Sequence, residues 1–203
     1  ASATPYSALA MAELAHRAGF PAGVFNVLTG SASVMAAEMA SNVKVRKVTF
    51  TGSTEVGKKL TAQTAQTMKR VSMELGGNAP FVVFDDADLA LTLNCAYGSK
   101  VRNAGQTCIA PDYVLLPRGR EGEFAQAYRA AVVRLFPTIE GNADYASIIT
   151  PRHHARLRTM LQQAQTQGAE VHTIDPTDGK QVAPTVGTLG DGASRQMLPS
   201  LVF

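Results

Sequence analysis

The chain has 203 residues, of which 45% are hydrophobic and 17% are charged, which is ordinary for a soluble globular domain or for parts of two domains. Its formal net charge of +3, with no dense run of Lys or Arg, gives no support for a nucleic-acid partner. No apolar run approaches the roughly 20 residues of a membrane span, so we expect no membrane partner. Two cysteines are too few for a disulfide framework, which favours a reduced, cytoplasmic setting.

The first 75 residues alternate between helical and strand-like patterns. Thr4 is a good N-cap and Pro5 a good first helical position, so we expect a helix from there to Gly19. The remaining pattern predicts strands at 24–28, 48–51 and 71–75 and helices at 30–40 and 54–66. Strands that alternate with helices imply a parallel, doubly wound α/β sheet.

The second part of the chain begins at the glycine pair Gly76-Gly77. Its pattern predicts strands at 81–84, 113–116, 171–174 and 198–203 and helices at 88–102, 122–135 and 151–167. The stretch 175–194 is rich in Gly, Pro, Asp and Thr, so we expect mostly loop there. Asp85, Asp86 and Asp88 precede a helix and are expected to be caps, and we predict no metal site.

The two cysteines have different surroundings. Cys95 lies in an apolar helical stretch, where a cysteine is expected to be a small buried hydrophobe. Cys108 follows Gly105 in a loop of small polar residues, where a thiol can react. Glu74, beside the glycine pair, is a candidate partner, although most Glu residues are solvated or ion-paired. A thiolate nucleophile with a carboxylate base is an arrangement for covalent catalysis.

Three patterns carry a family resemblance. They are Phe50-Thr51-Gly52-Ser53-Thr54-Glu55-Val56-Gly57, Met73-Glu74-Leu75-Gly76-Gly77-Asn78-Ala79-Pro80 and Asn103-Ala104-Gly105-Gln106-Thr107-Cys108. With these patterns in this order, the chain resembles an aldehyde dehydrogenase over essentially all of its residues. The family's enzymes are more than twice this long, so we expect an internal fragment of a parent enzyme that is a homo-oligomer. The resemblance implies that residues 1–75 are the C-terminal part of the dinucleotide-binding domain and residues 76–203 the N-terminal part of the catalytic domain.

The expected cofactor is NADP or NAD. Gly52-Ser53 links a strand to a helix, where backbone N–H groups favour an anion such as a pyrophosphate. Taken alone, Ser53 is more typical of an N-cap, and the fingerprint with three glycines is absent. The resemblance implies that Gly52 and Ser53 line the dinucleotide site and that the Leu75 backbone lies near the nicotinamide.

Ala1 and Ser2 resemble the end of a family motif, Lys-Pro-Ala-Ser, that edges the adenosine ribose. NAD-preferring relatives often carry Glu where Ser2 stands. Because Ser2 does not repel a 2′-phosphate, we expect NADP to be accepted at least as well as NAD.

The implied reaction is oxidation of an aldehyde to a carboxylic acid. The Cys108 thiolate attacks the aldehyde carbon, hydride leaves to the nicotinamide, and Glu74 activates the water that hydrolyses the thioester. The backbone N–H of Cys108 can be one oxyanion donor. The family's second donor, an Asn side chain, precedes this fragment.

The substrate indications are mixed. Arg102 lies six positions before Cys108, where succinate-semialdehyde dehydrogenases use an Arg to hold the remote carboxylate of the substrate. It could equally be a cation at a helix C-terminus. Residues 72–88 resemble the succinate-semialdehyde subfamily, whereas residues 109–114 resemble the coniferyl-aldehyde dehydrogenase group, which takes aromatic or long aldehydes. A divergent member and a recombined sequence would each explain this.

Two rival hypotheses remain open at this point. The first is an inactive dinucleotide-binding fragment, because family residues are missing at both ends, and the isolated fragment is expected to be inactive. The second is a thiol acyltransferase that uses the Cys108 thioester without a cofactor.

Overall fold

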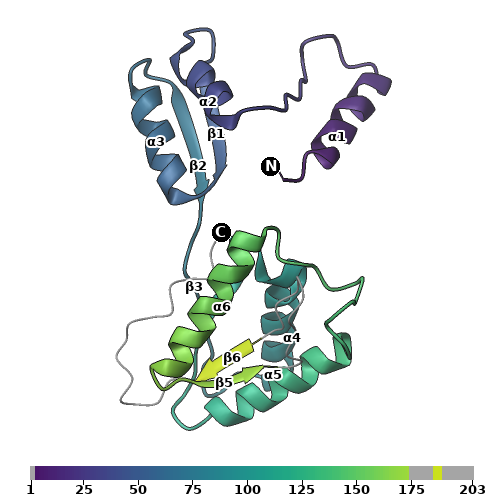
Figure 1. The fold of residues 1–203 in the computed structure, drawn as a ribbon, viewed down its shortest axis with the longest axis vertical. Helices are drawn as coiled ribbons and strands as arrows, with labels where there is room; N and C mark the ends of the chain where they lie inside the picture. The colour runs from purple at the N-terminus through teal and green to yellow at the C-terminus, as the bar shows by residue number, and fades with distance from the viewer. Residues whose placement is uncertain (1–2, 174–184, 189–203) are drawn as a thin grey trace. The chain divides into compact units, whose positions relative to one another are not determined.

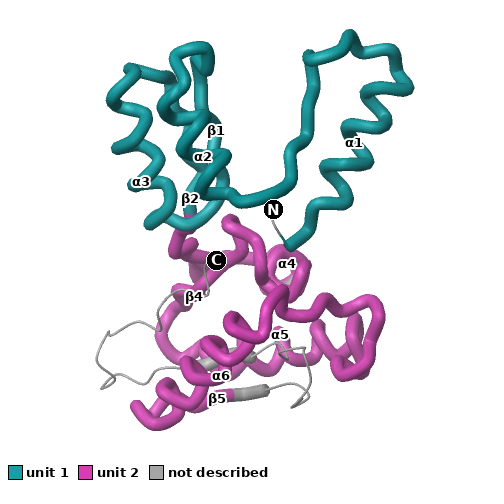
Figure 2. The backbone as a smooth tube through the Cα atoms, turned by 45° about the horizontal axis from the view of Figure 1, so that its top comes forward, with its two compact units in different colours: residues 1–75 teal, residues 76–203 magenta. Residues whose placement is uncertain are grey.

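The computed structural model describes residues 3–173 and 185–188 (Figure 1). The chain divides into two compact units, residues 1–75 and residues 76–203 (Figure 2). The division falls at the start of the glycine pair Gly76-Gly77. In the described residues, no helix has both the length and the apolar character needed to cross a membrane.

Unit 1 contains one strand–helix–strand unit and two further helices. Its elements are α1 (Tyr6–Arg17), α2 (Ala32–Ser41), β1 (Lys47–Gly52), α3 (Thr54–Ala65) and β2 (Arg70–Leu75). The strands β1 and β2 are parallel, an arrangement that needs a crossover connection, and Figure 1 shows the connecting helix α3 alongside them. Val48 of β1 and Leu60 of α3 are buried. Gly57 lets α3 approach β2 closely, because a Cβ there would lie 2.6 Å from Leu75 Cδ2.

Two predictions for unit 1 are wrong. Residues 24–28 do not form a strand, because the chain turns at 21–24, where the Val24 N–H donates to the Pro21 carbonyl at 3.2 Å. Gly23 takes a positive φ of 86° in this turn, and the described residues offer 24–28 no strand to pair with. Thr4 is not the N-cap of α1. Pro5 occupies that position, and no side chain caps the helix.

Unit 2 places helices on a pair of parallel strands. Its elements are β3 (Ala79–Val82), α4 (Leu89–Lys100), the short 3-10 helix η1 (Arg102–Gly105), β4 (Pro111–Leu115), α5 (Glu121–Leu135), α6 (Pro151–Thr166), β5 (Glu170–Thr173) and β6 (Thr185–Thr188). The strands β3 and β4 are parallel, whereas β5 and β6 are antiparallel. The main core lies between α4 and α5 and contains Leu93, Ala96, Val101, Phe124, Tyr128 and Val132.

Helix starts in unit 2 follow local capping. The Leu91 N–H donates to Asp88 Oδ1 at 2.9 Å, which confirms Asp88 as a cap of α4. The Thr150 side chain caps α6, where Pro151 is the first residue. The strand expected at 81–84 lies two residues earlier, at 79–82.

The stretch expected to be mostly loop contains the strand β6, four residues in length. It pairs with β5, so a partner strand gave order to residues that are rich in turn formers in the sequence. The other residues of 175–194 and the strand predicted at 198–203 lie outside the described residues.

A small second core lies beside the main one. Ile139 is fully buried and Tyr145 is 4% exposed, and Phe136 and Ala104 pack against them. We call these four residues the Ile139 cluster. The rings of Phe136 and Tyr145 meet edge to face with centroids 5.1 Å apart.

The substitution Tyr145→Phe should reduce the loss of stability at alkaline pH. Burial raises the pKa of Tyr145 from 10.0 to about 12. Well below pH 10 the phenol of Tyr145 is neutral in both the folded and the unfolded protein. Above pH 10 it ionises in the unfolded chain first, so the free energy of unfolding falls with rising pH until the pKa of the folded state is passed. Between about pH 8 and about pH 11, the parent should lose on the order of 1 kcal/mol more than the variant in urea unfolding. Equal losses would contradict this.

Candidate active site

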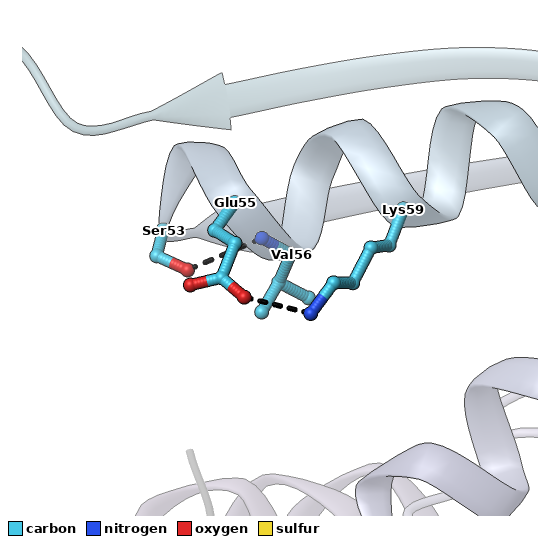
Figure 3. Close-up of polar contacts among 4 residues, drawn as sticks. All are labelled: Ser53, Glu55, Val56 and Lys59. Carbon is cyan, nitrogen blue, oxygen red and sulfur yellow. Dashed lines mark hydrogen bonds and ion pairs between the residues drawn. The ribbon is translucent and has the colours of Figure 1, made fainter.

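The turn between β1 and α3 forms the first part of the candidate site. Ser53 is the N-cap of α3, and its Oγ accepts a hydrogen bond of 3.3 Å from the Val56 N–H (Figure 3). Glu55 lies in the first helical turn and pairs with Lys59 at 2.7 Å, with both side chains exposed. The capping role that the residue type predicts for Ser53 is therefore confirmed, and the turn has the geometry of a helix N-terminus that follows a strand.

The parallel pairing of β1 and β2 brings four predicted site residues to one edge of unit 1. Gly52 pairs with Leu75 and Thr51 pairs with Glu74, so the carboxyl ends of the two strands lie side by side. Ser53 follows Gly52 directly. The carboxyl edge of parallel strands is where open α/β sheets bind ligands.

Gly52 is a position of close approach. A Cβ there would stand 2.4 Å from Cζ of the Phe50 ring, so a larger residue would displace that ring. Glu74 is exposed on β2, and Leu75 is partly buried against Gly57. Ala1 and Ser2 lie outside the described residues.

Cys108 lies in a tight turn between η1 and β4 in unit 2. It is exposed, and the Ala110 N–H donates to the Thr107 carbonyl at 3.0 Å across the turn. The preceding Asn103, Ala104 and Gly105 have φ values of 52°, 54° and 77°. Three consecutive left-handed residues are unusual, and Ala104 in this region costs roughly 1–2 kcal/mol. Such a turn persists only where its surroundings hold it.

The side chain of Gln106 links this turn to a distant segment by hydrogen bonds. Its Nε2 donates to the Asn103 carbonyl at 2.9 Å and to the Ser147 carbonyl at 3.1 Å. Its Oε1 accepts from the Ile149 N–H at 2.9 Å. Ala104 adds an apolar contact with the buried residues of the Ile139 cluster, Ile139 and Tyr145. Sequence reasoning missed Gln106 because its partners lie 41 and 43 residues away.

Gly77 also lies close to the cysteine loop. A Cβ on Gly77 would stand 3.7 Å from the Cys108 carbonyl oxygen. Gly77 comes three residues after Glu74, which itself belongs to unit 1, whereas Cys108 belongs to unit 2.

The burial predicted for Cys95 is wrong. Both cysteines are free and exposed. The helix α4 buries Leu93 and Ala96, which are three residues apart and share one face. Cys95, two residues after Leu93, points to the other side of the helix, where Leu91 is also 63% exposed.

Arg102 is the first residue of η1 and is exposed. It follows the buried Val101 and lies two residues beyond the C-terminal end of α4. His153 and His154 are adjacent on α6, and the part of the chain that the structure describes holds no group of three His, Cys, Asp or Glu that could bind a metal ion.

Comparison with known proteins decides the family. The profile of the aldehyde dehydrogenase family matches residues 1–194. The chain belongs to the aldehyde dehydrogenase family. This confirms the resemblance and the α/β fold class expected from it.

Two similar relatives are semialdehyde dehydrogenases. A glutarate-semialdehyde dehydrogenase of Pseudomonas aeruginosa is 48% identical over 173 residues, and an NADP-dependent succinate-semialdehyde dehydrogenase of Escherichia coli is 47% identical over the same length. Each alignment covers 84% of this chain and 36% of the relative, so the chain spans about a third of the length of the curated relatives it matches.

Solved structures of similar proteins have the same fold as this chain. A succinate-semialdehyde dehydrogenase of Burkholderia pseudomallei superposes with a TM-score of 0.87 at 37% identity and covers 100% of this chain and 44% of that one. A crystal structure described as an NADP-dependent enzyme of E. coli has a TM-score of 0.85 at 41% identity, over 95% of this chain and 41% of that one.

The substitution Gln106→Ala should loosen the cysteine turn. It removes the side-chain hydrogen bonds to Asn103, Ser147 and Ile149. We expect the free energy of unfolding to fall by roughly 1–3 kcal/mol and the Ile149 amide to exchange its hydrogen faster. Gln163→Ala, at an exposed position of α6, is the matched control. An unchanged exchange rate at Ile149 would show that Gln106 does not hold the turn.

Proposed function

We propose that the protein containing this chain oxidises an aldehyde to a carboxylic acid with NADP or NAD, through a thioester on Cys108. The observation that supports this most is the Cys108 turn, an exposed thiol in a strained loop held by Gln106 within a chain of the aldehyde dehydrogenase family. An inert structural cysteine needs neither exposure nor a costly backbone.

The chain's own residues account for the thiol chemistry. The Cys108 thiolate attacks the carbonyl carbon and forms a thiohemiacetal oxyanion, which the Cys108 backbone N–H can stabilise. Loss of hydride then leaves a thioester. Glu74 takes a proton from the water that attacks this thioester, which releases the acid and returns the thiolate. A thiol that must stay free favours a reducing compartment such as the cytoplasm.

The residues at the β1–β2 edge fit a dinucleotide. Gly52 leaves room for close approach, and Ser53 opens a helix whose N-terminus attracts a pyrophosphate. When bound, the cofactor would accept the hydride. We therefore assign residues 1–75 to the C-terminal part of the dinucleotide-binding domain and residues 76–203 to the N-terminal part of the catalytic domain.

Chain connectivity supports the pairing of Glu74 with Cys108. Gly77 is three positions after Glu74, so the Cα atoms of the two residues lie within about 11 Å of each other. Gly77 stands beside the Cys108 carbonyl. Glu74 is therefore a close sequence neighbour of the residue that lies beside the cysteine loop.

For the substrate we propose a semialdehyde, whose remote carboxylate would be held by Arg102. The semialdehyde relatives and the exposed guanidinium near Cys108 support this. The second candidate is an aromatic or long aldehyde, favoured by the resemblance of residues 109–114 to the coniferyl-aldehyde group. Oxidation rates with succinate semialdehyde and with coniferyl aldehyde distinguish the two candidate substrates. The substitution Arg102→Gln should raise KM for succinate semialdehyde and leave KM for coniferyl aldehyde unchanged.

In the full-length protein, Cys108→Ala should abolish aldehyde oxidation, because the attacking thiolate is lost, while dinucleotide binding remains. Cys95→Ala is the matched control, since it removes the other exposed thiol, and its rate should stay within about twofold of the parent. Aldehyde-dependent cofactor reduction measures the rate and fluorescence titration the binding. An inactive Cys95→Ala with an active Cys108→Ala would refute the assignment. Acyl transfer by the parent without any dinucleotide would favour the acyltransferase hypothesis.

The substitution Glu74→Gln should stall the reaction after thioester formation. The amide cannot take the proton of the attacking water, so the first turnover should be retained and the steady-state rate should fall by about 10²-fold or more. Mass spectrometry of the stalled enzyme should find the acyl group on Cys108. Normal steady-state turnover would rule out this role for Glu74.

The substitution Ser2→Glu should shift the cofactor preference towards NAD. A carboxylate within about 4 Å of a 2′-phosphate opposes it by roughly 1 kcal/mol or more per charge. The effect should be mainly a higher KM for NADP, measured by steady-state kinetics with both cofactors. An unchanged ratio would mean that Ser2 does not face the ribose.

A further inference from the structure

A buried cation lies directly before the loop that carries Cys108. Lys100 is the last residue of α4, and 23% of its side chain is exposed. Its Nζ atom is buried and has no hydrogen-bond partner among the described residues. Burial lowers the pKa of Lys100, and the carboxylate of Asp112 acts in the opposite direction. A buried ammonium group is costly unless a charge nearby compensates it.

The compensating charge is Asp112, which follows Cys108 in the sequence. The Lys100 Nζ and Asp112 Oδ1 atoms are 3.9 Å apart, and 6% of the Asp112 side chain is exposed. The other oxygen, Oδ2, accepts a hydrogen bond of 2.8 Å from the Ala79 N–H at the start of β3. The β3–β4 register shifts between Ala79 and Pro80, which leaves Asp112 as the extra residue of a bulge. Its carboxylate thus fixes where β3 begins.

Lys100 also contacts the left-handed turn. A Cβ on Gly105 would stand 3.4 Å from Lys100 Cε and 3.5 Å from Nζ. The Thr107 N–H donates to the Gly105 carbonyl at 2.9 Å. The position of Gly105 therefore affects the position of Thr107, the residue before Cys108. Lys100 therefore lies beside the chain before Cys108, and Asp112 binds the strand start that follows Gly77.

We propose that Lys100 and Asp112 are a positioning pair that holds the Cys108 loop against the start of β3. This inference rests on the proposed function, because it takes Cys108 as the nucleophile. Neither residue touches the substrate. Lys100 lies beside Gly105, and Asp112 accepts a hydrogen bond from the first N–H of β3. The attraction between the Lys100 ammonium group and the Asp112 carboxylate joins the cysteine loop to the start of β3.

Stability alone is a weak explanation for the pair. Replacing a buried ion pair by apolar residues is often neutral or stabilising, whereas removing one partner leaves a buried charge alone. A small misplacement of a reacting group can cost about 10²-fold in rate. The test must therefore separate the position of the loop from the stability of the fold.

Hydrogen exchange on the full-length protein tests the loop position without using activity. Lys100→Met keeps an unbranched side chain but removes the charge, so the Thr107 and Ala110 amides should exchange about tenfold faster. Arg120→Met is the matched control, because it breaks an ion pair of the same unit at 3.1 Å in which both side chains are more exposed. Unchanged exchange at both amides in Lys100→Met would overturn the proposal.

Kinetics test the consequence for catalysis. In Lys100→Met, kcat per folded active site should fall about tenfold or more, while KM for the cofactor stays within about twofold. The double variant Lys100→Met/Asp112→Asn removes both charges and keeps an oxygen for the Ala79 N–H. Its kcat should recover towards the parent value, because no buried charge is left unpaired.

Two results would distinguish failure of this inference from failure of the proposed function. A lower melting temperature with an unchanged kcat per folded site would make the pair structural only and overturn the inference, although the proposed function would stand. A parent enzyme without aldehyde oxidation would refute the proposed function. The exchange rates of Thr107 and Ala110 would then decide by themselves whether the pair holds the loop.

Discussion

The exposure of Cys108 depends on the left-handed turn that precedes it. Without the reversal at 103–105, the chain would continue along α4, whose buried face belongs to the core shared with α5. The backbone strain at Ala104 is offset by contacts from far along the chain, namely the hydrogen bonds of Gln106 and the packing of the Ile139 cluster. The exposure of Cys108 therefore depends on contacts with segment 139–149 as well as on its neighbours in the sequence.

Local signals in the sequence predicted much of the architecture. The β-branched strand before Gly52-Ser53 gave β1 and the start of α3, because a cap and its helix are neighbours in the chain. Alternating strands and helices gave the parallel β1–β2 pair, and this pairing sets Gly52 opposite Leu75. A slip of one residue would turn Glu74 to the other face of the sheet, so the register is part of the site.

Features set by distant contacts were beyond local reasoning. Residues 24–28 have a strand-like composition, but a strand needs a neighbour to pair with. The partners of Gln106 and the ion pair of Lys100 with Asp112 join segments that only the folded chain brings together. The exposure of Cys95 follows from the phase of the helix, because Leu93 and Ala96 mark its buried face. Leu91 is also apolar but is 63% exposed, so apolar residues lie on both faces of α4 and the sequence did not show which face is buried.

The ion pair also bears on the mixed resemblance of the chain. Asp112 belongs to residues 109–114, which resemble the coniferyl-aldehyde group, whereas Lys100 lies between that segment and residues 72–88, which resemble the succinate-semialdehyde subfamily. The two side chains meet in a buried site, where a mismatched partner would leave one charge uncompensated. A cation at position 100 and an anion at position 112 are therefore needed together, whether the chain is a divergent member of the family or a recombined sequence.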